Sequence, residues 1–451
     1  MTATAPTLAS LAADLAAGRT TSRALVEACL ARIADTAGEG ARAFIHVARD
    51  QALAAADGQD ALRRAGAAPS PFAGIPVAIK DLFDITGEVT TAGSKALADA
   101  PPATTDATAV ARLRAAGFVV IGRSNMVEFA YSGLGLNPHY GTPKSPWQRA
   151  AGHVPGGSTS GGAVAVADGM AHAALGTDTG GSCRIPAAFC GITGYKPTAR
   201  RVPQDGAIPL SQSLDSIGPL ARSVACCAAL DAILAGEPLA PLEPASLIGL
   251  RFLVPATVAL DGLDPIVAQA FATAVAHLAQ AGASVVNAPV PEFGEIAGIN
   301  AKGGFTAAES YAWHRPLLAK SEALYDPRVS VRIKRGHEQE AADYLDALAA
   351  RRSLIARTNA RLAAYDALLL PTVAILPPAI APLEHDDAAY AAANILSLRN
   401  ATLINMIDGC AISLPIQAPE NAPVGLMIAA TGGNDARLFA IAAGVEAELT
   451  A

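Results

Sequence analysis

Residues 156–198 read GGSTSGGAVAVADGMAHAALGTDTGGSCRIPAAFCGITGYKPT, and this stretch organises the rest of the chain. It contains two serines flanked by glycines, Ser158 and Ser182. Glycine beside a serine removes Cβ crowding and lets the backbone approach a ligand closely. Successive N–H groups in such a turn can converge on a developing negative charge. The pattern therefore suggests acyl-transfer chemistry, for which a serine needs a base.

Upstream of this stretch, a lysine ends a run that is typical of a buried strand. Residues 75–79 are apolar with several β-branched side chains, and Lys80 follows them directly. Burying an ammonium group is costly, so a lysine at this place is unusual. Two interpretations stay open at this point: an ion pair with Asp81 or Asp84, or a chemical role beside the two serines.

The remaining pattern predicts one large α/β domain over residues 1–451, without repeats or linkers. A β-α-β pattern at 248–290 implies parallel strands with helices packed on the sheet. Residues 291–365 are mainly helical and more polar, whereas residues 131–157 form a long loop. Helices are expected at 7–35 (in two parts), 47–65, 106–116, 125–130, 161–170, 184–189, 222–235, 264–281, 387–406 and 434–449. Strands are expected at 75–79, 118–122, 171–176, within 213–220, and at 248–254, 283–286, 366–371, 411–415 and 424–428.

Composition excludes several classes of protein. Of the 451 residues, 51% are hydrophobic and 16% are charged, and the net charge is −7, which argues against a nucleic-acid binder. No window resembles a membrane span and the N-terminus lacks a signal pattern, so we expect a cytoplasmic protein without a membrane partner. The six cysteines show no zinc spacing and are expected to be reduced and buried. No metal or organic cofactor is expected.

Other serine chemistries find little support in the sequence. There is no Gly-x-Ser-x-Gly elbow, and no serine has a lysine three residues further on. A Ser-His-Asp arrangement with His139, His153 or His172 as the base stays open, but no sequence context favours it.

The segment 156–198, together with IKDLFD at 79–84, resembles the amidase signature family of serine hydrolases. Further matching motifs are GTDTGGS at 176–182, RIPAAFCG at 184–191, SLDxxGPLARS at 213–223, DALLLPT at 366–372 and PVGL at 423–426. The resemblance covers nearly the whole chain and is weakest at about 236–365. It implies a mixed β-sheet flanked by helices on both faces, with the core motif at 71–224 and a variable helical region at 291–365.

The resemblance also implies a Ser–cis-Ser–Lys triad. The matching residues are Ser182 as the nucleophile, Ser158 as the bridging serine after a cis Gly157–Ser158 bond, and Lys80 as the base. Desolvation at the end of a buried strand lowers the pKa of an amine and favours its neutral form, which fits this role. Ser182 in turn would give up its proton through Ser158 to Lys80.

The turn before the nucleophile is implied to stabilise the reaction. Backbone N–H groups of Thr179, Gly180, Gly181 and Ser182 would form an oxyanion hole. Asp178 and Arg184 match a pair that braces this turn, and Thr177 is expected to hydrogen-bond within it. Cys183 stands where Ile or Val is frequent in the family, and its neighbours indicate a packing role.

Family resemblance places the acyl pocket among the 129–142 loop, the turn after Ser182 and the wall at 404–417. The candidate substrate-binding residues are Tyr131, Leu134, Leu136, Tyr140, Ile404, Ile407 and Gln417. No arginine pair suited to a dicarboxylate is evident, which favours a neutral, partly apolar amide, anilide or carbamate. The basic residues Arg332, Lys334 and Arg335 are interpreted as a solvated helix face.

The predicted function is that of an amidase, which hydrolyses a small-molecule amide or carbamate through an acyl-enzyme. One alternative is the glutaminase subunit of a tRNA-dependent amidotransferase, which passes ammonia to a partner enzyme. Another is a non-catalytic binding scaffold, which would leave the Ser/Ser/Lys set unexplained. A homodimer is left open.

Overall fold

The computed structural model describes residues 6–417 and 420–450. Across them, 11 strands form one mixed sheet in the order β1-β3-β2-β4-β6-β5-β10-β11-β9-β7-β8. The strands are β1 (Phe44–Val47), β2 (Pro76–Lys80), β3 (Val119–Ser124), β4 (Ala173–Thr177), β5 (Thr193–Lys196), β6 (Ile217–Ala221), β7 (Arg251–Pro255), β8 (Ser284–Ala288), β9 (Ala367–Pro371), β10 (Cys410–Pro415) and β11 (Gly425–Ala430). The pairs β2–β3, β2–β4, β7–β8 and β7–β9 are parallel, and the others are antiparallel.

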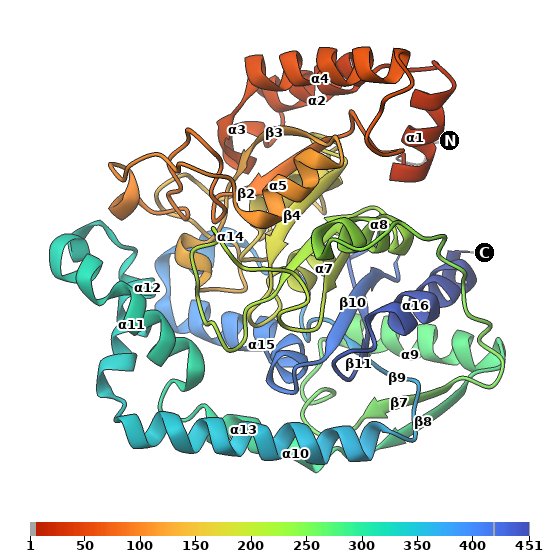
Figure 1. The fold of residues 1–451 in the computed structure, drawn as a ribbon. Coiled ribbons are helices and arrows are strands. Elements are labelled where there is room, and N and C mark those ends of the chain that lie inside the picture. The colour runs from red at the N-terminus through yellow and green to blue at the C-terminus, as the bar shows by residue number, and fades with distance from the viewer. Residues whose placement is uncertain (1–5, 418–419, 451) are drawn as a thin grey trace.

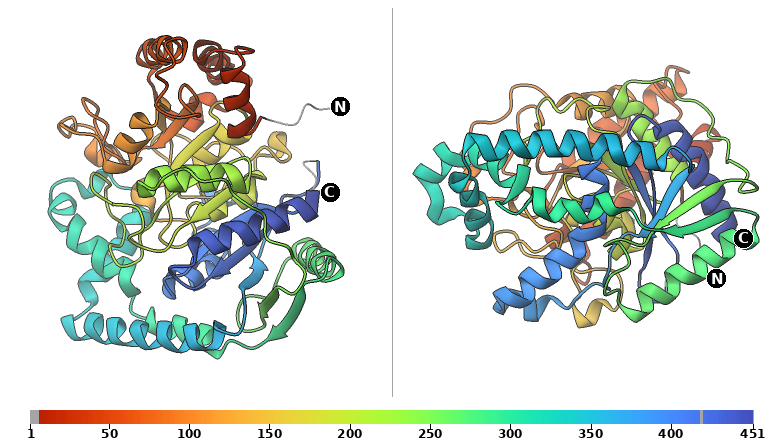
Figure 2. Two further views of the ribbon diagram at one scale, coloured as in Figure 1. Left: turned by 45° about the vertical axis from the view of Figure 1, so that its right-hand side comes forward. Right: turned by 90° about the horizontal axis from the view of Figure 1, so that it is seen from below.

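Helices cover both faces of this sheet, as Figures 1 and 2 show. They are α1 (Leu8–Ala16), α2 (Ser22–Ala34), α3 (Gly40–Ala43), α4 (Arg49–Arg64), α5 (Thr108–Ala115), α6 (Ser160–Ala167), α7 (Arg184–Cys190), α8 (Val224–Ala235), α9 (Pro265–Gln280), α10 (Pro291–Ile299), α11 (Gly304–Ser321), α12 (Pro327–Lys334), α13 (Ala341–Leu362), α14 (Ile380–His385), α15 (Asp387–Met406) and α16 (Asp435–Thr450). Short 3₁₀ turns lie at Lys95–Leu97, Glu128–Ala130, Arg149–Ala151, Glu322–Leu324 and Arg335–Glu338.

Strand β2 illustrates why the central strands read as continuous apolar runs. Val77 and Ile79 belong to the apolar cluster that holds α1, α5 and α8, whereas Ala78 belongs to the cluster that holds α2, α4 and α6. Successive side chains of a strand point to opposite faces, so a strand covered on both faces needs apolar residues at every position. The predicted mixed sheet with helices on both faces is therefore confirmed.

Most elements lie where the sequence pattern predicts them. The pattern does not predict the short helices α3 and α14, and three further exceptions have clear causes. Strand β1 is short, half-exposed and at the sheet edge, so it carries little apolar pattern. Strand β5 contains Gly194, where a Cβ would lie 2.4 Å from the carbonyl oxygen of Cys183. Because glycine is unfavourable in strands, the sequence pattern does not predict a strand here. The helix predicted at 125–130 is only a 3₁₀ turn, with Phe129 at a positive φ of 49°.

The region at 291–365 is helical, as predicted. In Figure 1, α11 and α12 lie at the left side of the molecule, and α13 runs along its lower edge. Helix α10 packs beside α13, which the view from below in Figure 2 also shows. Among the described residues, none of the helices is both long and apolar enough to span a bilayer.

Candidate active site

Lys80 and Ser158 meet at the carboxyl end of two neighbouring parallel strands. Lys80 ends β2 and Thr177 ends β4, and these strands pair in parallel register. The Lys80 Nζ atom lies 2.8 Å from Ser158 Oγ and 2.7 Å from Thr177 Oγ1. Thr177 thus contacts the lysine rather than the following turn, which corrects the expectation for this residue. The reason is that a side chain at the end of β4 faces the end of β2 across the pair.

The alternative in which Lys80 pairs with a neighbouring aspartate does not hold. Asp81 is buried and pairs with Arg123, whose Nη1 lies 3.1 Å from Asp81 Oδ1. Asp84 accepts a hydrogen bond from the Thr90 hydroxyl at 2.7 Å. Both carboxylates therefore have other partners, and the contacts of the lysine amine are to hydroxyl groups.

Burial changes the pKa of the Lys80 amine, because this side chain has 0% exposed surface. Desolvation lowers its pKa from 10.5 to about 8, although Cys183, Asp215 and Asp178 act in the opposite direction. The pKa is lowered rather than raised because a low-dielectric environment disfavours the charged ammonium form. With a pKa of about 8, roughly a tenth of the amine is neutral at pH 7.

Backbone contacts fix the position of Ser158. The Gly157–Ser158 bond is cis, as the family resemblance implies. The Ser158 carbonyl accepts a hydrogen bond from the Val127 N–H at 3.1 Å, and the Gly157 N–H donates to the Gly133 carbonyl at 2.9 Å. Ser158 has 0% exposed surface, so its hydroxyl is held beside Lys80 rather than in solvent.

Ser182 lies in the turn between β4 and α7 and lines a cavity of about 230 Å³ together with Thr179 and Gly180. Within the described residues, no hydrogen bond joins the Ser158 and Ser182 hydroxyls. The preceding residue, Gly181, has a φ of 125°, and a Cβ there would lie 2.5 Å from side-chain atoms of Ala401 and Ile185. Only glycine fits this close approach, which places the turn against α15.

The turn offers fewer free N–H groups than the sequence predicts. The Gly181 N–H donates to Asp178 Oδ1 at 2.8 Å, so this amide is already engaged. The prediction that Gly181 belongs to the oxyanion hole is therefore corrected. In the part of the chain that the structure describes, the N–H groups of Thr179, Gly180 and Ser182 have no hydrogen-bond acceptor.

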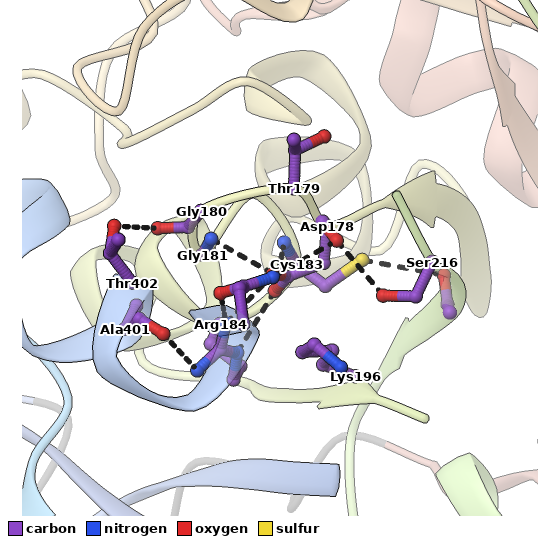
Figure 3. A network of polar contacts seen from close by, with 12 residues as sticks. Asp178, Thr179, Gly180, Gly181, Cys183, Arg184, Lys196, Ser216, Ala401 and Thr402 are labelled. Carbon is purple, nitrogen blue, oxygen red and sulfur yellow. Dashed lines mark hydrogen bonds and ion pairs between the residues drawn. The ribbon is translucent and has the colours of Figure 1, made fainter. Parts of the chain in front are cut away.

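A buried ion pair braces the turn from one side (Figure 3). Arg184 Nη2 lies 2.7 Å from Asp178 Oδ1 and Arg184 Nε lies 2.9 Å from Asp178 Oδ2, with 0% of either side chain exposed. Arg184 also donates to the Asn405 Oδ1 atom at 2.6 Å and to the Ala401 carbonyl at 3.1 Å, so α15 is tied to the turn. Burial alone raises the pKa of Asp178, but the charge and hydrogen bonds of Arg184, with Lys196 and Asn405, hold that pKa well below its usual range.

Replacing Arg184 with methionine is expected to destabilise the fold strongly. The change leaves the Asp178 carboxylate buried without its partner, which typically costs about 3–5 kcal/mol of unfolding free energy. Urea denaturation measures this loss. Arg357→Met is the matched control, because Arg357 makes a similar two-point contact with Glu295 at the surface and should leave the urea midpoint almost unchanged. Equal midpoints for the two variants would contradict the role of the buried pair.

A second carboxylate holds the turn from the other side. Asp215 accepts a hydrogen bond from the Thr179 hydroxyl and further bonds from the Leu210 and Ser211 N–H groups, the latter two at 3.0 Å. Burial raises the pKa of Asp215 to about 6, against the effect of these donors. Asp215, which belongs to the SLDxxGP motif, thus positions Thr179, one of the three residues of the turn whose N–H groups are free in the described chain.

Cys183, next to Ser182, is a packing residue, as predicted. Its side chain has 0% exposed surface and its Sγ atom lies 3.5 Å from the Gly218 carbonyl oxygen. Burial raises the pKa of this thiol, with Asp178 adding to the effect, so the thiol stays protonated.

The structure revises the predicted pocket. Tyr131 lines the cavity at Ser182. Leu134 and Leu136 pack instead with Ile185 and Phe189. Ile404 and Ile407 pack in the core with Met427. Tyr140 lies under the Lys95 ammonium, with 4.1 Å from Nζ to the ring centroid. Gln417, in a bend after β10, also does not line the cavity in the described chain.

Sequence reasoning missed the polar residues that face the cavity. They come mainly from the segment around the start of α11 and from α12 and α15. They are Ser132, Asn300, Thr306, Arg332, Asn394 and Thr402. Helix α15 carried a usable signal, because Asn394, Ser397, Asn400 and Asn405 recur at helical spacing on its buried side. Buried polar groups at helical spacing need partners or a ligand.

The described residues contain no group of three or more His, Cys, Asp or Glu side chains placed to hold a metal ion. The groups that contact the amine of Lys80 are the hydroxyls of Ser158 and Thr177.

Known proteins resemble the chain over nearly its whole length. The sequence model of the family described as Amidase matches residues 24–439. A 2-amino-5-chloromuconic acid deaminase from Comamonas testosteroni is 39% identical over 407 residues, which cover 88% of this chain and 86% of the relative. A glutamyl-tRNA(Gln) amidotransferase subunit from Chloroflexus aggregans is 36% identical, with 95% of this chain and 93% of the relative covered.

Solved structures agree with these sequence matches. A crystal structure of an amidase superposes with a TM-score of 0.88 at 33% identity, covering 98% of this chain and 99% of that chain. The peptide amidase from Stenotrophomonas maltophilia gives a TM-score of 0.81 at 29% identity, covering 99% of this chain and 97% of the other. The chain belongs to the amidase family and is an amidohydrolase. The interpretation as a non-catalytic scaffold is thereby set aside.

Proposed function

We propose that the chain hydrolyses the C–N bond of a small-molecule amide through an acyl-enzyme formed on Ser182. The observation that supports this most directly is the 2.8 Å contact between Lys80 Nζ and Ser158 Oγ, where neither side chain is exposed. A neutral amine can accept a proton from a hydroxyl group, and burial supplies the neutral form. Thr177 holds the amine from its other side at 2.7 Å.

In the acylation step of this proposal, Lys80 takes the proton of Ser158 while Ser158 takes that of Ser182. The Ser182 oxygen then attacks the carbonyl carbon of the amide. Negative charge develops on the carbonyl oxygen, which accepts hydrogen bonds from the free N–H groups of Thr179, Gly180 and Ser182. Each such donor contributes about 2.7–4 kcal/mol to stabilising the transition state. The C–N bond breaks as the proton returns through Ser158 to the leaving nitrogen, which departs as ammonia or an amine.

Deacylation reuses the same groups in the reverse direction. A water molecule gives a proton to the relay of Ser158 and Lys80 and attacks the acyl carbon. The acid product leaves, and the proton on the relay restores the Ser182 hydroxyl. The buried ion pair of Asp178 and Arg184 keeps the turn in place through both steps.

A second candidate is the glutaminase subunit of a tRNA-dependent amidotransferase. Relatives named as glutamyl-tRNA(Gln) amidotransferase subunits match over almost the whole chain at 36% identity, which favours keeping this candidate. Another relative is named for an acid substrate, 2-amino-5-chloromuconic acid, so a charged substrate also fits the family. Both candidates use the same chemistry at Ser182 and differ in substrate and partner.

Assays of the purified chain alone separate the two candidates. We expect turnover of small amides, aryl amides or carbamates without any added protein, measured by release of ammonia or amine. Glutamine is included in the panel as the substrate of the second candidate. Activity confined to glutamine and dependent on a co-purifying subunit would overturn the free-standing amidase and favour the glutaminase.

A further inference from the structure

The peptide that joins Gly180 to Gly181 needs contacts from outside the turn to keep one orientation. Neither residue has a Cβ, so steric contacts restrict the rotation of this peptide less than that of its neighbours. Its N–H end is held, because the Gly181 N–H donates to Asp178 Oδ1 at 2.8 Å. Its carbonyl end is held as well, because the Thr402 hydroxyl donates to the Gly180 oxygen at 3.4 Å (Figure 3). Two polar contacts, one at each end, therefore set the orientation of this peptide.

The hydroxyl of Thr402 is directed away from its own helix. A threonine within a helix commonly donates to the carbonyl four residues earlier, as Thr273 in α9 does to the Gln269 carbonyl at 2.9 Å. Within the described residues, Thr402 makes no such bond to Leu398, and the Gly180 carbonyl is the acceptor for its hydroxyl instead. The side chain of Thr402 thus connects α15 to the turn before Ser182 rather than closing a bond inside the helix.

Two further contacts connect α15 to the same turn. Asn405 lies three residues after Thr402, on the same face of the helix, and its Nδ2 atom donates to Asp178 Oδ1 at 3.0 Å. The Ala401 carbonyl accepts a hydrogen bond from Arg184 at 3.1 Å. A single helix therefore supports both ends of the peptide, the carbonyl end through Thr402 and the N–H end through the Asp178 carboxylate.

The peptide lies between two of the N–H groups that the proposed mechanism uses. Gly180 comes directly before it and Ser182 directly after it, and both residues line the cavity, whereas Gly181 is not part of the lining. Rotation of the peptide changes ψ of Gly180 and φ of Gly181, so it moves the N–H groups of Gly180 and Ser182 relative to each other. Two donors stabilise one developing negative charge only when both point at the same oxygen.

We propose that Thr402 is a positioning residue for the reaction. Its hydroxyl holds the Gly180–Gly181 peptide so that the N–H groups of Gly180 and Ser182 converge on the oxygen of the transition state. This inference rests on the proposed function, because it concerns the same step at Ser182. Thr402 is 222 positions away from Gly180 in the sequence and lies outside the motifs that mark the catalytic residues.

Three variants test this role. Thr402→Val removes the hydroxyl and keeps the shape of the side chain, whereas Thr402→Ser keeps the hydroxyl and removes a methyl group. Thr358→Val is the matched control, because Thr358 is a buried threonine of α13 whose hydroxyl has no partner in the described part of the chain. The values of kcat and KM are measured with the best amide of the panel, and thermal unfolding shows that each variant is folded.

Thr402→Val is expected to lower kcat by about three- to tenfold and to leave KM within about twofold of wild type, because the lost hydrogen bond acts on the transition state. Thr402→Ser should keep at least about half of the wild-type kcat, and Thr358→Val should change neither constant by more than about twofold. A wild-type kcat in Thr402→Val, or an equal loss in Thr402→Ser, would overturn the proposal. So would a higher KM at unchanged kcat, which would indicate a contact of Thr402 with the substrate itself.

Hydrogen exchange separates failure of this inference from failure of the proposed function, because it needs no turnover. The Gly181 N–H is bonded to a buried carboxylate, so its hydrogen exchanges only when the peptide opens. The exchange rate is followed by NMR on protein labelled with ¹⁵N-glycine. In Thr402→Val this rate should be about three- to tenfold higher than in wild type, and in Thr358→Val it should be unchanged.

The two readouts together decide the outcome. Faster exchange in Thr402→Val without hydrolysis of any amide by the wild type would support the hold of Thr402 on the peptide and contradict the proposed function. Normal amide hydrolysis, with the same kcat and the same exchange rate in Thr402→Val, would leave the proposed function intact and overturn the inference. A lower kcat at an unchanged exchange rate would overturn it too, because the peptide would not have moved.

Discussion

Replacing Ser182 with alanine is expected to lower kcat by at least about 10⁴-fold, because the acyl-enzyme can no longer form. The fold should survive the change. Ser182 makes no side-chain hydrogen bond within the described residues, so alanine leaves no partner unpaired. Steady-state assays with the best amide of the panel measure the loss, and thermal unfolding checks that the midpoint stays within about 2 °C of wild type.

A matched control separates the nucleophile from serines that only pack nearby. Ser160 is buried at the start of α6 and makes one long hydrogen bond of 3.5 Å, to the Asn125 carbonyl. Ser160→Ala should keep kcat within about threefold, because the bond lost is weak. Rapid mixing with an aryl amide should also show a burst of amine equal to the enzyme concentration in wild type and none in Ser182→Ala. Retention of more than a tenth of wild-type kcat by Ser182→Ala would rule out this residue as the nucleophile.

The sequence was informative where the backbone itself is unusual. The glycines around Ser158 and Ser182 mark close backbone approaches, and the lysine after an apolar strand marks a buried amine. Both signals are local, so they can be read without knowing what packs against them. The contact of Lys80 with Ser158 joins residues 78 positions apart, and only the family resemblance connected them before the structure did.

The predicted pocket shows what sequence position alone cannot supply. Leu134 and Ile404 come from segments that do reach the site, yet both side chains turn into the core. Neighbours of each on the same segments, Tyr131 and Thr402, line the cavity instead. Which residue of a segment faces a cavity depends on the local twist of the chain and on its packing partners. A sequence motif specifies neither the local twist nor the packing partners.

The turn before Ser182 gives a second example. Gly180 and Gly181 look equivalent in the sequence, but the Gly181 N–H is taken by the Asp178 carboxylate. That contact depends on Arg184 and Asn405 holding the carboxylate in place. A network of this kind joins α7, α15 and the turn, so it becomes visible only in three dimensions.

Replacing Lys80 is expected to lower kcat/KM by at least about 10³-fold, because the relay loses its base. Lys80→Arg and Lys80→Met serve different purposes. Arginine keeps the positive charge but does not deprotonate in the working pH range, so it tests whether the neutral form is needed. Methionine has a similar length and no charge, and it avoids a buried cation altogether. Both variants should be nearly inactive if the amine acts as a base, whereas a purely electrostatic role would spare Lys80→Arg.

The pH dependence of the wild-type enzyme follows from the lowered pKa of Lys80. The protonated amine predominates below pH 8 and cannot accept a proton, so kcat/KM should fall tenfold for each pH unit below that value and level off above it. At pH 6 the rate should therefore be about one hundredth of the plateau. A neutral substrate is used for this profile, so that titration of the substrate does not contribute. A rate that stays constant from pH 8 to pH 6 would be incompatible with a lysine base.

Lys196 is the control that makes this profile specific. Burial lowers the pKa of Lys196 to about 8 as well. A pH profile with a midpoint near 8 therefore does not by itself show which of the two lysines is the base. Its amine donates to the carbonyls of Pro197 and Gly409, both at 2.7 Å, and contacts neither serine. Lys196→Met should therefore lower the stability of the fold, yet the folded fraction should keep the same titration near pH 8. If Lys196→Met made the pH profile of kcat/KM flat while Lys80→Arg kept its activity, Lys196 rather than Lys80 would be the base. That result would also contradict the proton relay through Ser158.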